Sequence, residues 1–287
     1  MMKLWTNQDE INFFKKSLNG FSSVEDIFYR LNSKYYAYIP KGMDAKGATI
    51  QSRNSLIGKY TEKWAKDLFD PIAKENGLYA LNSVICSNLG LNSQSSADLA
   101  FCTTNEHIQK AENIKLLFEI KMSIVSNYEY ISKQEIKCIG DYKTHTGNPS
   151  LLRSDSMLKA IGKSINIRVS GNDGVKIPII ILGNSPITKN YAHKADVLKN
   201  SGIIQGFWSI NPNPTDDFIE KTDKLGFQTI KDYSVLTQIT KELLALELNY
   251  FSSMITKAEL GKLIMIASKE KSDEEKAEKF LELLRDK

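Results

Sequence analysis

Three residues in the sequence have the types and spacing needed to hold a divalent cation beside a phosphate ester. Asp98 lies in the segment Ser-Ala-Asp-Leu-Ala-Phe, and Glu119 and Lys121 lie in Leu-Phe-Glu-Ile-Lys-Met. Two carboxylates that meet at one point repel each other unless a cation joins them, and Mg²⁺ prefers such oxygen ligands. An amine beside this cation is placed to orient or deprotonate a water and to neutralise negative charge on phosphorus.

The segments around these residues are expected to be adjacent strands. The apolar pattern predicts a meander of three strands at residues 78–86, 97–103 and 116–123. Glu119 and Lys121 are two residues apart on one strand, so alternation sends both side chains to the same face. The strand at 97–103 is followed by a polar loop that leads back into the strand at 116–123, so Asp98 is expected to lie across from Glu119.

Helical and strand patterns continue on both sides of this meander. Helices are predicted over residues 56–74, 154–168 and 191–200 and in the tail from residue 234, and strands over 177–182 and 202–210. The first forty residues read as one or two helices, whereas 41–55 reads as a loop and 127–153 as irregular. Ser272 and Glu275 have the spacing of a capping box that opens the last helix. This order predicts an α/β fold with a mixed central sheet flanked by helices, and helical additions at both ends.

Asp98, then twenty intervening residues and Glu119-x-Lys121, in strands that come after a helix, resembles the PD-(D/E)XK nuclease signature. The order of the flanking elements resembles that fold, and the layout of the whole chain resembles the type II restriction endonucleases. Ala97 stands where the signature has proline. The resemblance implies one restriction-endonuclease-like domain over residues 1–287, with the catalytic core at about 56–210 and a helical C-terminal elaboration at about 234–287.

The resemblance also implies an activity and a set of ligands. We expect a type II site-specific endonuclease that hydrolyses phosphodiester bonds of double-stranded DNA at a short sequence. Asp98 and Glu119 would hold one or two Mg²⁺, and Lys121 would assist. Many of these nucleases carry a glutamate on the helix before the first catalytic strand, for which Glu62 is the candidate; its alternative is a surface glutamate paired with Lys66.

The charge of the chain bears on its partners. The net charge is +4, but residues 121–200 carry twelve Lys/Arg against six Asp/Glu, which is +6. A basic segment beside an acidic pocket suits a DNA backbone, although a solvated lysine-rich surface has the same charge. The stretch 133–163 is the best candidate for backbone contact, and Asn148 and Arg153 have the side chains that read base edges. The DNA-binding candidates are Arg53, Lys59, Lys137, Lys143, Asn148, Arg153 and Lys159.

A homodimer is expected, because enzymes that cut both strands of a symmetric site match its two-fold symmetry. The C-terminal helices either supply that interface or pack on their own core. No apolar run approaches the roughly 20 residues of a membrane helix, so no membrane partner is expected. No secretory signal is recognised, and the three widely spaced cysteines favour a reducing cytoplasm. The chain has no G-x-x-x-x-G-K-[ST] pattern, so no nucleotide cofactor is expected.

Two alternatives stay open at this point. One is another nuclease of the same fold, acting in repair or in a different defence system without sequence-specific restriction. The other is a non-enzymatic DNA-binding or assembly protein in which Asp98 and Glu119 are surface acids.

Overall fold

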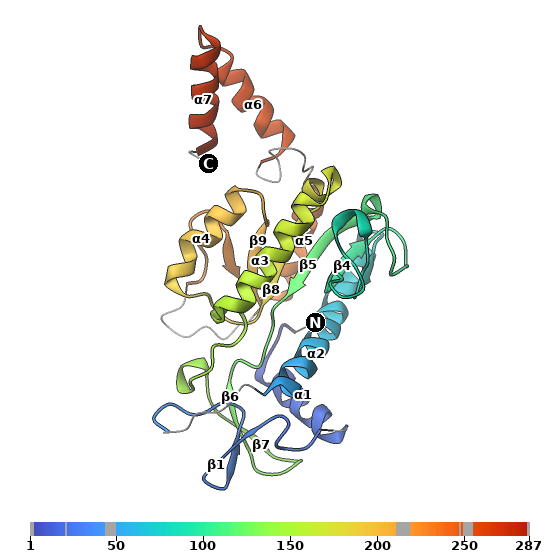
Figure 1. Ribbon diagram of the computed structural model, residues 1–287, viewed down its shortest axis with the longest axis vertical. Helices are drawn as coiled ribbons and strands as arrows, with labels where there is room; N and C mark the ends of the chain where they lie inside the picture. The colour runs from blue at the N-terminus through green and yellow to red at the C-terminus, as the bar shows by residue number, and fades with distance from the viewer. Residues whose placement is uncertain are drawn as a thin grey trace.

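The computed structural model describes residues 3–20, 22–43, 50–210, 219–246, 248 and 255–285. At the centre of the molecule is a six-stranded mixed sheet with the strand order β10-β9-β8-β5-β4-β3 (Figure 1). Its strands are β3 (Tyr79–Leu81), β4 (Leu99–Cys102), β5 (Ile114–Ile120), β8 (Ile179–Gly183), β9 (Gly206–Ser209) and β10 (Phe227–Thr229). The first three form an antiparallel meander, and β8, β9 and β10 extend the sheet from β5 with parallel pairing. The predicted α/β class with a mixed central sheet is therefore confirmed.

Helices cover both faces of this sheet. The helices in contact with one core are α1 (Asn7–Asn19), α2 (Gln51–Glu75) and α5 (Tyr233–Leu244), and those in contact with the other are α3 (Ser154–Val169) and α4 (Lys189–Asn200). On the α2 side, Phe69 of the helix packs against Phe118 of β5, with ring centroids 4.4 Å apart. On the α3 side, buried Met157 lies in the same cluster as Leu117 and Phe207. Apolar residues at helical spacing thus bury one face of each helix against the sheet.

The alternation of side chains along β5 decides which layer receives its polar groups. Phe118 and Ile120 belong to the core on the α2 side, whereas Leu117 belongs to the core on the α3 side. Successive side chains of a strand point to opposite faces. Glu119 and Lys121 therefore point toward the layer that contains α3.

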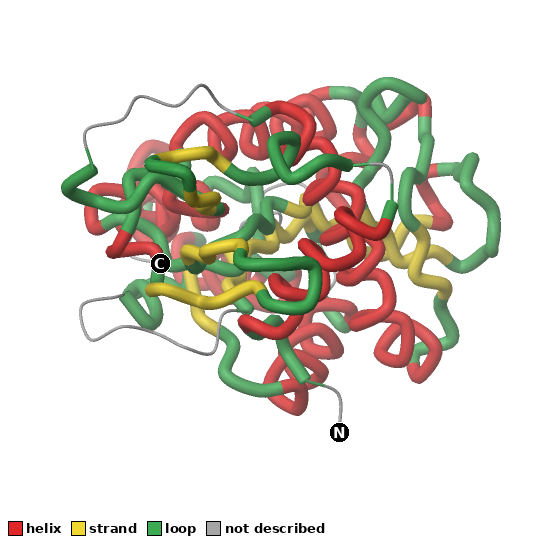
Figure 2. The backbone as a smooth tube through the Cα atoms, turned by 90° about the horizontal axis from the view of Figure 1, so that it is seen from below, coloured by secondary structure: helices red, strands yellow, loops and turns green. Residues whose placement is uncertain are grey.

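A second, smaller sheet lies at one end of the molecule, with the strand order β1-β2-β6-β7 (Figure 1). Its strands are β1 (Tyr29–Leu31), β2 (Lys34–Tyr36), β6 (Asn127–Tyr130) and β7 (Ile136–Gly140). In the view from that end, these strands lie nearest the viewer (Figure 2). The predicted second N-terminal helix and the predicted irregular course of 127–153 are therefore wrong. Asn32 and Ser33, with φ of +48° and +62°, form the tight two-residue turn that makes a hairpin of β1 and β2.

The remaining boundaries differ from the predictions in smaller ways. α2 begins at Gln51, so the predicted loop over 41–55 ends early, and β10 follows β9, which was predicted to be the last strand. The tail contains α5 and then α6 (Lys257–Ala267) and α7 (Asp273–Arg285), which pack on each other at the end opposite the small sheet (Figure 1). The predicted capping box is present, since Glu275 N donates to Ser272 Oγ at 3.2 Å and Ser272 N donates to Glu275 Oε2 at 2.9 Å. Parts of the predicted loop (44–49) and helical tail (247 and 249–254) lie outside the described residues.

Among the helices that the structure describes, none combines the length and the apolar character that crossing a bilayer requires.

Candidate active site

The meander brings the two predicted carboxylates together. The antiparallel register of β4 and β5 pairs Leu99 with Phe118. Asp98, just before β4, and Glu119, inside β5, therefore stand opposite each other on the α3 side of the sheet. Asp98 Oδ2 also accepts a hydrogen bond of 2.8 Å from the backbone N–H of Ile120. This bond ties the aspartate to the neighbouring strand and fixes the separation of the two acids.

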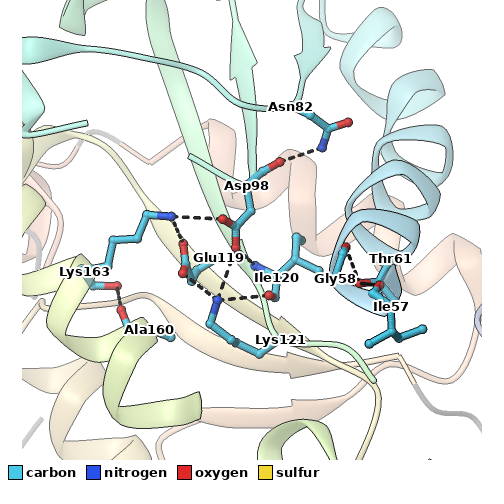
Figure 3. A network of polar contacts seen from close by, with 11 residues as sticks. Ile57, Gly58, Thr61, Asn82, Asp98, Glu119, Ile120, Lys121, Ala160 and Lys163 are labelled. Atoms are coloured by element: carbon cyan, nitrogen blue, oxygen red, sulfur yellow. Dashed lines mark hydrogen bonds and ion pairs between the residues drawn. The ribbon is translucent and has the colours of Figure 1, made fainter. Parts of the chain in front are cut away.

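Two lysine ammonium groups close a ring with these carboxylates (Figure 3). Lys121 Nζ lies 2.7 Å from Glu119 Oε1 and 3.4 Å from Asp98 Oδ2. Lys163 Nζ lies 2.6 Å from Glu119 Oε2 and 3.1 Å from Asp98 Oδ1. Each carboxylate thus offers one oxygen to each lysine. The structure brings together the three residues that the sequence pattern singled out and adds a fourth.

Lys163 is the functional candidate that sequence reasoning missed. The sequence placed it at the end of the basic stretch 133–163 without a role in the site. Its side chain reaches the carboxylates from α3, and it lies on the same face of the helix as Ser156 and Lys159, at spacings of three and four residues. This periodicity was readable from the sequence. That the face turns toward Asp98 depends on how α3 packs on the sheet, which the sequence alone does not reveal.

Asn82 joins the candidate site to helix α2. Its side-chain amide donates to the backbone oxygen of Asp98 at 2.6 Å and to the backbone oxygen of Glu62 at 3.1 Å. On the other side, the backbone N–H of Lys121 donates to Leu182 O of β8 at 2.7 Å. Hydrogen bonds to the backbone of Asp98 and from the backbone of Lys121 therefore hold both residues in place, as a preorganised site requires.

The charges of the four residues depend on one another. Burial opposes ionisation of Asp98, but Lys121 and Lys163 outweigh it and hold the pKa of that carboxyl below its ordinary value. Burial and the charge of Asp98 together raise the pKa of Glu119. Burial alone would lower the pKa of Lys121 and Lys163, yet the two acids outweigh it, so both pKa values lie above the usual range.

Glu62 faces the same cleft from α2. Its side chain lines the hollow that also contains Asp98, Glu119 and Lys163. Burial, and next the charge of Asp98, raise the pKa of Glu62 to about 7. Because the charge of Asp98 affects the pKa of Glu62, this carboxyl lies near the candidate site. The alternative, a surface glutamate paired with Lys66, therefore describes Glu62 less well. Its role as a metal ligand stays a prediction.

Two neighbouring clefts meet at Lys121. The first, of about 480 Å³, contains the four ring residues and Glu62 and is otherwise lined by polar residues: Gln94, Ser95, Ser96, Ser156 and Lys159. The second, of about 580 Å³, runs from Lys121 toward the small sheet and shares Ser156 and Lys159 with the first. A long substrate that enters one cleft can therefore continue into the other along the face of α3.

The second cleft contains a part of the predicted DNA-binding set. Asn148, Arg153 and Lys159 line it with exposed side chains. Arg153 is held near the helix by a 2.5 Å ion pair with Asp155. Arg53 is only 4% exposed, and its guanidinium donates to the backbone oxygen of Ala37. Arg53 therefore forms part of the wall of the cleft, and it would have to break this hydrogen bond to contact DNA directly.

The other predicted DNA contacts lie apart from these clefts. Lys59 projects from α2 into a separate hollow beside α1, together with Lys16 and Tyr60. Lys137 is exposed on β7 of the small sheet. Lys143 lies on the short turn that follows this strand. A duplex seated along α3 would reach these three lysines only by also contacting the small sheet or the opposite layer.

The donor atoms of the site fit a hard cation. Asp98 Oδ1 and Glu119 Oε2 face one point, which Lys163 Nζ occupies at 3.1 and 2.6 Å. Two carboxylate oxygens facing one point are ligands that Mg²⁺ takes, with waters completing its shell. Among the residues that the structure describes, no three or more His, Cys, Asp or Glu side chains gather closely enough to hold a metal. That Asp98 and Glu119 hold Mg²⁺ stays a prediction.

No family model, curated protein or solved structure matches this chain. Any assignment of function therefore depends on the geometry of Asp98, Glu119, Lys121 and Lys163 and on the clefts around them.

Proposed function

We propose that this chain is a magnesium-dependent endonuclease of the type II restriction class, which hydrolyses phosphodiester bonds of double-stranded DNA at a specific short sequence. The observation that carries the proposal is the meeting of Asp98, Glu119 and Lys121 in one cleft, on adjacent strands and within ion-pair distance. The groups that the sequence signature names are thus near one another in space as well as in pattern.

The order of the elements supports the same proposal. α2 precedes the meander β3-β4-β5, and α3 leads from it to β8, which pairs parallel to β5. This is the order in which the PD-(D/E)XK resemblance expects them. A mixed α/β sheet alone is compatible with many activities, so the order supports the assignment only together with the side chains.

The proposed chemistry is hydrolysis of a phosphodiester. A water oxygen bonds to phosphorus, the bond from phosphorus to one bridging oxygen breaks, and the departing oxygen takes up a proton. Mg²⁺ held by Asp98 and Glu119 would supply Lewis acidity at the scissile phosphate. Lys121 contributes a fixed positive charge beside these acids, which stabilises the negative charge that develops on phosphorus. This role uses the ammonium form, which its carboxylate neighbours favour.

The second cleft is the proposed path of the substrate. Lys159 and Arg153 supply positive charge along α3, and Asn148 supplies an amide that can pair with a base edge. Because the path begins at Lys121, a duplex bound along it would place one backbone phosphate at the candidate site. We further propose that the protein acts in the cytoplasm as a homodimer, because a symmetric DNA site calls for two copies of the active site; light scattering on the full chain measures this state.

The test is digestion of plasmid and phage DNA in the presence of Mg²⁺. Discrete bands are expected from the unaltered protein, and none from Asp98→Asn or Lys121→Met. Lys74→Met is the matched control, since this exposed lysine pairs with Asp70 on α2, away from both clefts. A smear would instead assign a nuclease without sequence specificity, and cleavage of single-stranded or branched DNA alone would favour a repair or defence role. Intact DNA under all these conditions would contradict the proposal.

A further inference from the structure

Lys163 occupies the position that a divalent cation needs. Its ammonium lies between Asp98 Oδ1 and Glu119 Oε2, at 3.1 and 2.6 Å. The side chain is only 15% exposed, and the acids are similarly covered, at 16% and 10%. A positive charge in the cleft between two buried carboxylates neutralises them as a metal ion would.

The charges of these four residues determine what the binding of a metal ion requires. Asp98 and Glu119 carry two negative charges, and Lys121 and Lys163 carry two positive charges, so the ring is neutral without a metal. Adding Mg²⁺ with both lysines in place would leave an excess of two positive charges in a site of low exposure, which is unfavourable. Binding of the metal therefore requires one ammonium to leave the carboxylates or an anion to enter with the metal.

Lys163 is the lysine that can leave. Lys121 is held by three acceptors, because its ammonium also donates to the backbone oxygen of Ile120 at 3.2 Å and its chain is fixed to β8. The ammonium of Lys163 contacts the two carboxylates, and its long side chain comes from a helix across the cleft (Figure 3). A rotation about its side-chain bonds moves the ammonium away from the acids without moving the sheet.

We propose that Lys163 is a built-in counter-ion that holds Asp98 and Glu119 until a divalent cation and a substrate phosphate bind together, and that it then moves to the phosphate. The phosphate half of this proposal rests on the nuclease function proposed above. The consequence is that the metal binds weakly to the protein alone. A ligand that competes with a resident group has its affinity reduced by the fraction of time for which the site is open.

Calorimetric titration of the DNA-free protein with Mg²⁺ tests the first half. Lys163→Met removes the charged ammonium and keeps an unbranched side chain, so we expect it to bind Mg²⁺ about tenfold more tightly than the unaltered protein, corresponding to a site that is open about a tenth of the time. Lys74→Met, at an exposed position of α2 outside both clefts, is the matched control and should leave the affinity unchanged. Equal or weaker binding by Lys163→Met would overturn the proposal.

Thermal stability supplies a second measurement of the counter-ion role. Removing Lys163 leaves two carboxylates facing one ammonium, so the variant should melt at a lower temperature, and Mg²⁺ should raise its melting temperature more than that of the unaltered protein. If Lys163→Met does not fold, Lys163→Gln is measured in the same way. An equal rise in both proteins would contradict the counter-ion role.

Binding of a short DNA duplex, followed by fluorescence anisotropy, tests the second half. Lys163→Met should weaken DNA binding more in the presence of Mg²⁺ than in its absence, because the lysine is engaged with the acids when no metal is present. An equal loss under both conditions would overturn the transfer to phosphate. If plasmid DNA stays intact but Lys163→Met still binds Mg²⁺ more tightly, the counter-ion stands and the nuclease function fails. If plasmid DNA is cleaved but Lys163→Met does not bind Mg²⁺ more tightly, the counter-ion role alone is contradicted.

Discussion

Replacing Glu10 by glutamine is expected to remove a pH dependence of folding that this one buried carboxyl creates. Glu10 lies on α1 and is 1% exposed. It accepts hydrogen bonds from Trp5 Nε1 at 3.0 Å, from the backbone N–H groups of Val125 and Ser126 at 2.7 and 3.1 Å, and from the Tyr128 hydroxyl at 2.9 Å. These bonds fasten α1 to the chain that leaves the candidate site after β5.

The direction of the effect follows from the pKa of Glu10. Burial raises it from 4.5 to about 7, even though its four hydrogen bonds act in the opposite sense. The folded state therefore holds the proton more tightly than the unfolded state does. The stability that comes from the protonated carboxyl is fully present below about pH 4.5 and is lost as the pH rises through about 7. Between about pH 5 and about pH 8, the loss from this group is about 2.5 kcal/mol.

The assay is urea denaturation of the unaltered protein and of Glu10→Gln at about pH 5 and about pH 8. The free energy of unfolding of the unaltered protein should fall by about 2.5 kcal/mol more than that of the variant over this interval. Titrations elsewhere cancel in this double difference, and Glu106→Gln, on an exposed loop, controls for the substitution itself. The reasoning is refuted if the two proteins lose the same stability within about 0.5 kcal/mol, the usual scatter of such differences.

Three further outcomes are expected. Burial and the charge of Asp98 raise the pKa of Glu62 to about 7, so its ionised form, which can bind a cation, appears as the pH rises through that value. The affinity for Mg²⁺ should therefore increase over this interval, and Glu62→Gln should flatten the increase. Identical pH profiles of the two proteins would show that Glu62 does not take part. Lys121→Met should slow single-turnover cleavage by about 10²-fold or more while leaving DNA affinity nearly unchanged, and an equal loss of both would reduce Lys121 to a substrate contact. Replacing Arg168 by methionine should lower the free energy of unfolding by about 3 kcal/mol, because its guanidinium donates to four backbone oxygens and to Gln205 Oε1. Lysine should not restore that loss, because one ammonium cannot reach so many acceptors, and full rescue in chemical denaturation would count against this account.

Much of the central layer was predictable because its signals are local. The helix before the meander follows apolar residues at helical spacing, and β8 follows from an uninterrupted apolar run. The shared face of Glu119 and Lys121 follows from the two-residue period of a strand alone. The small sheet was missed because β1 and β2 are short, and Val24, Ile27, Phe28 and Leu31 lie at helical spacing before and into β1. Asn32 and Ser33 at positive φ make the turn that decides otherwise, and Ser33 stands where the usual Asn-Gly pair has glycine.

The candidate site was predictable as far as adjacent strands determine it, and no further. Asp98 and Glu119 meet through one antiparallel register, as expected for two strands that are consecutive in the chain. Lys163 and the shared wall of Ser156 and Lys159 depend on the rotation of α3 against the sheet. Arg53 shows the same limit from the other side, since a positive side chain in a polar segment suggested DNA contact, whereas the fold buries it against Ala37.

The small sheet restricts how the chain can be shortened. β1 and β2 come from residues before α2, whereas β6 and β7 come from the connection between β5 and α3. A two-stranded hairpin is marginally stable in water by itself. A fragment that starts at Gln51 would keep Asp98, Glu119 and Lys121 yet leave the edge of β6 without its partner, an edge prone to self-association. The missing segment, added as a separate peptide, should pair with that edge, so the two pieces ought to reassemble as a split protein.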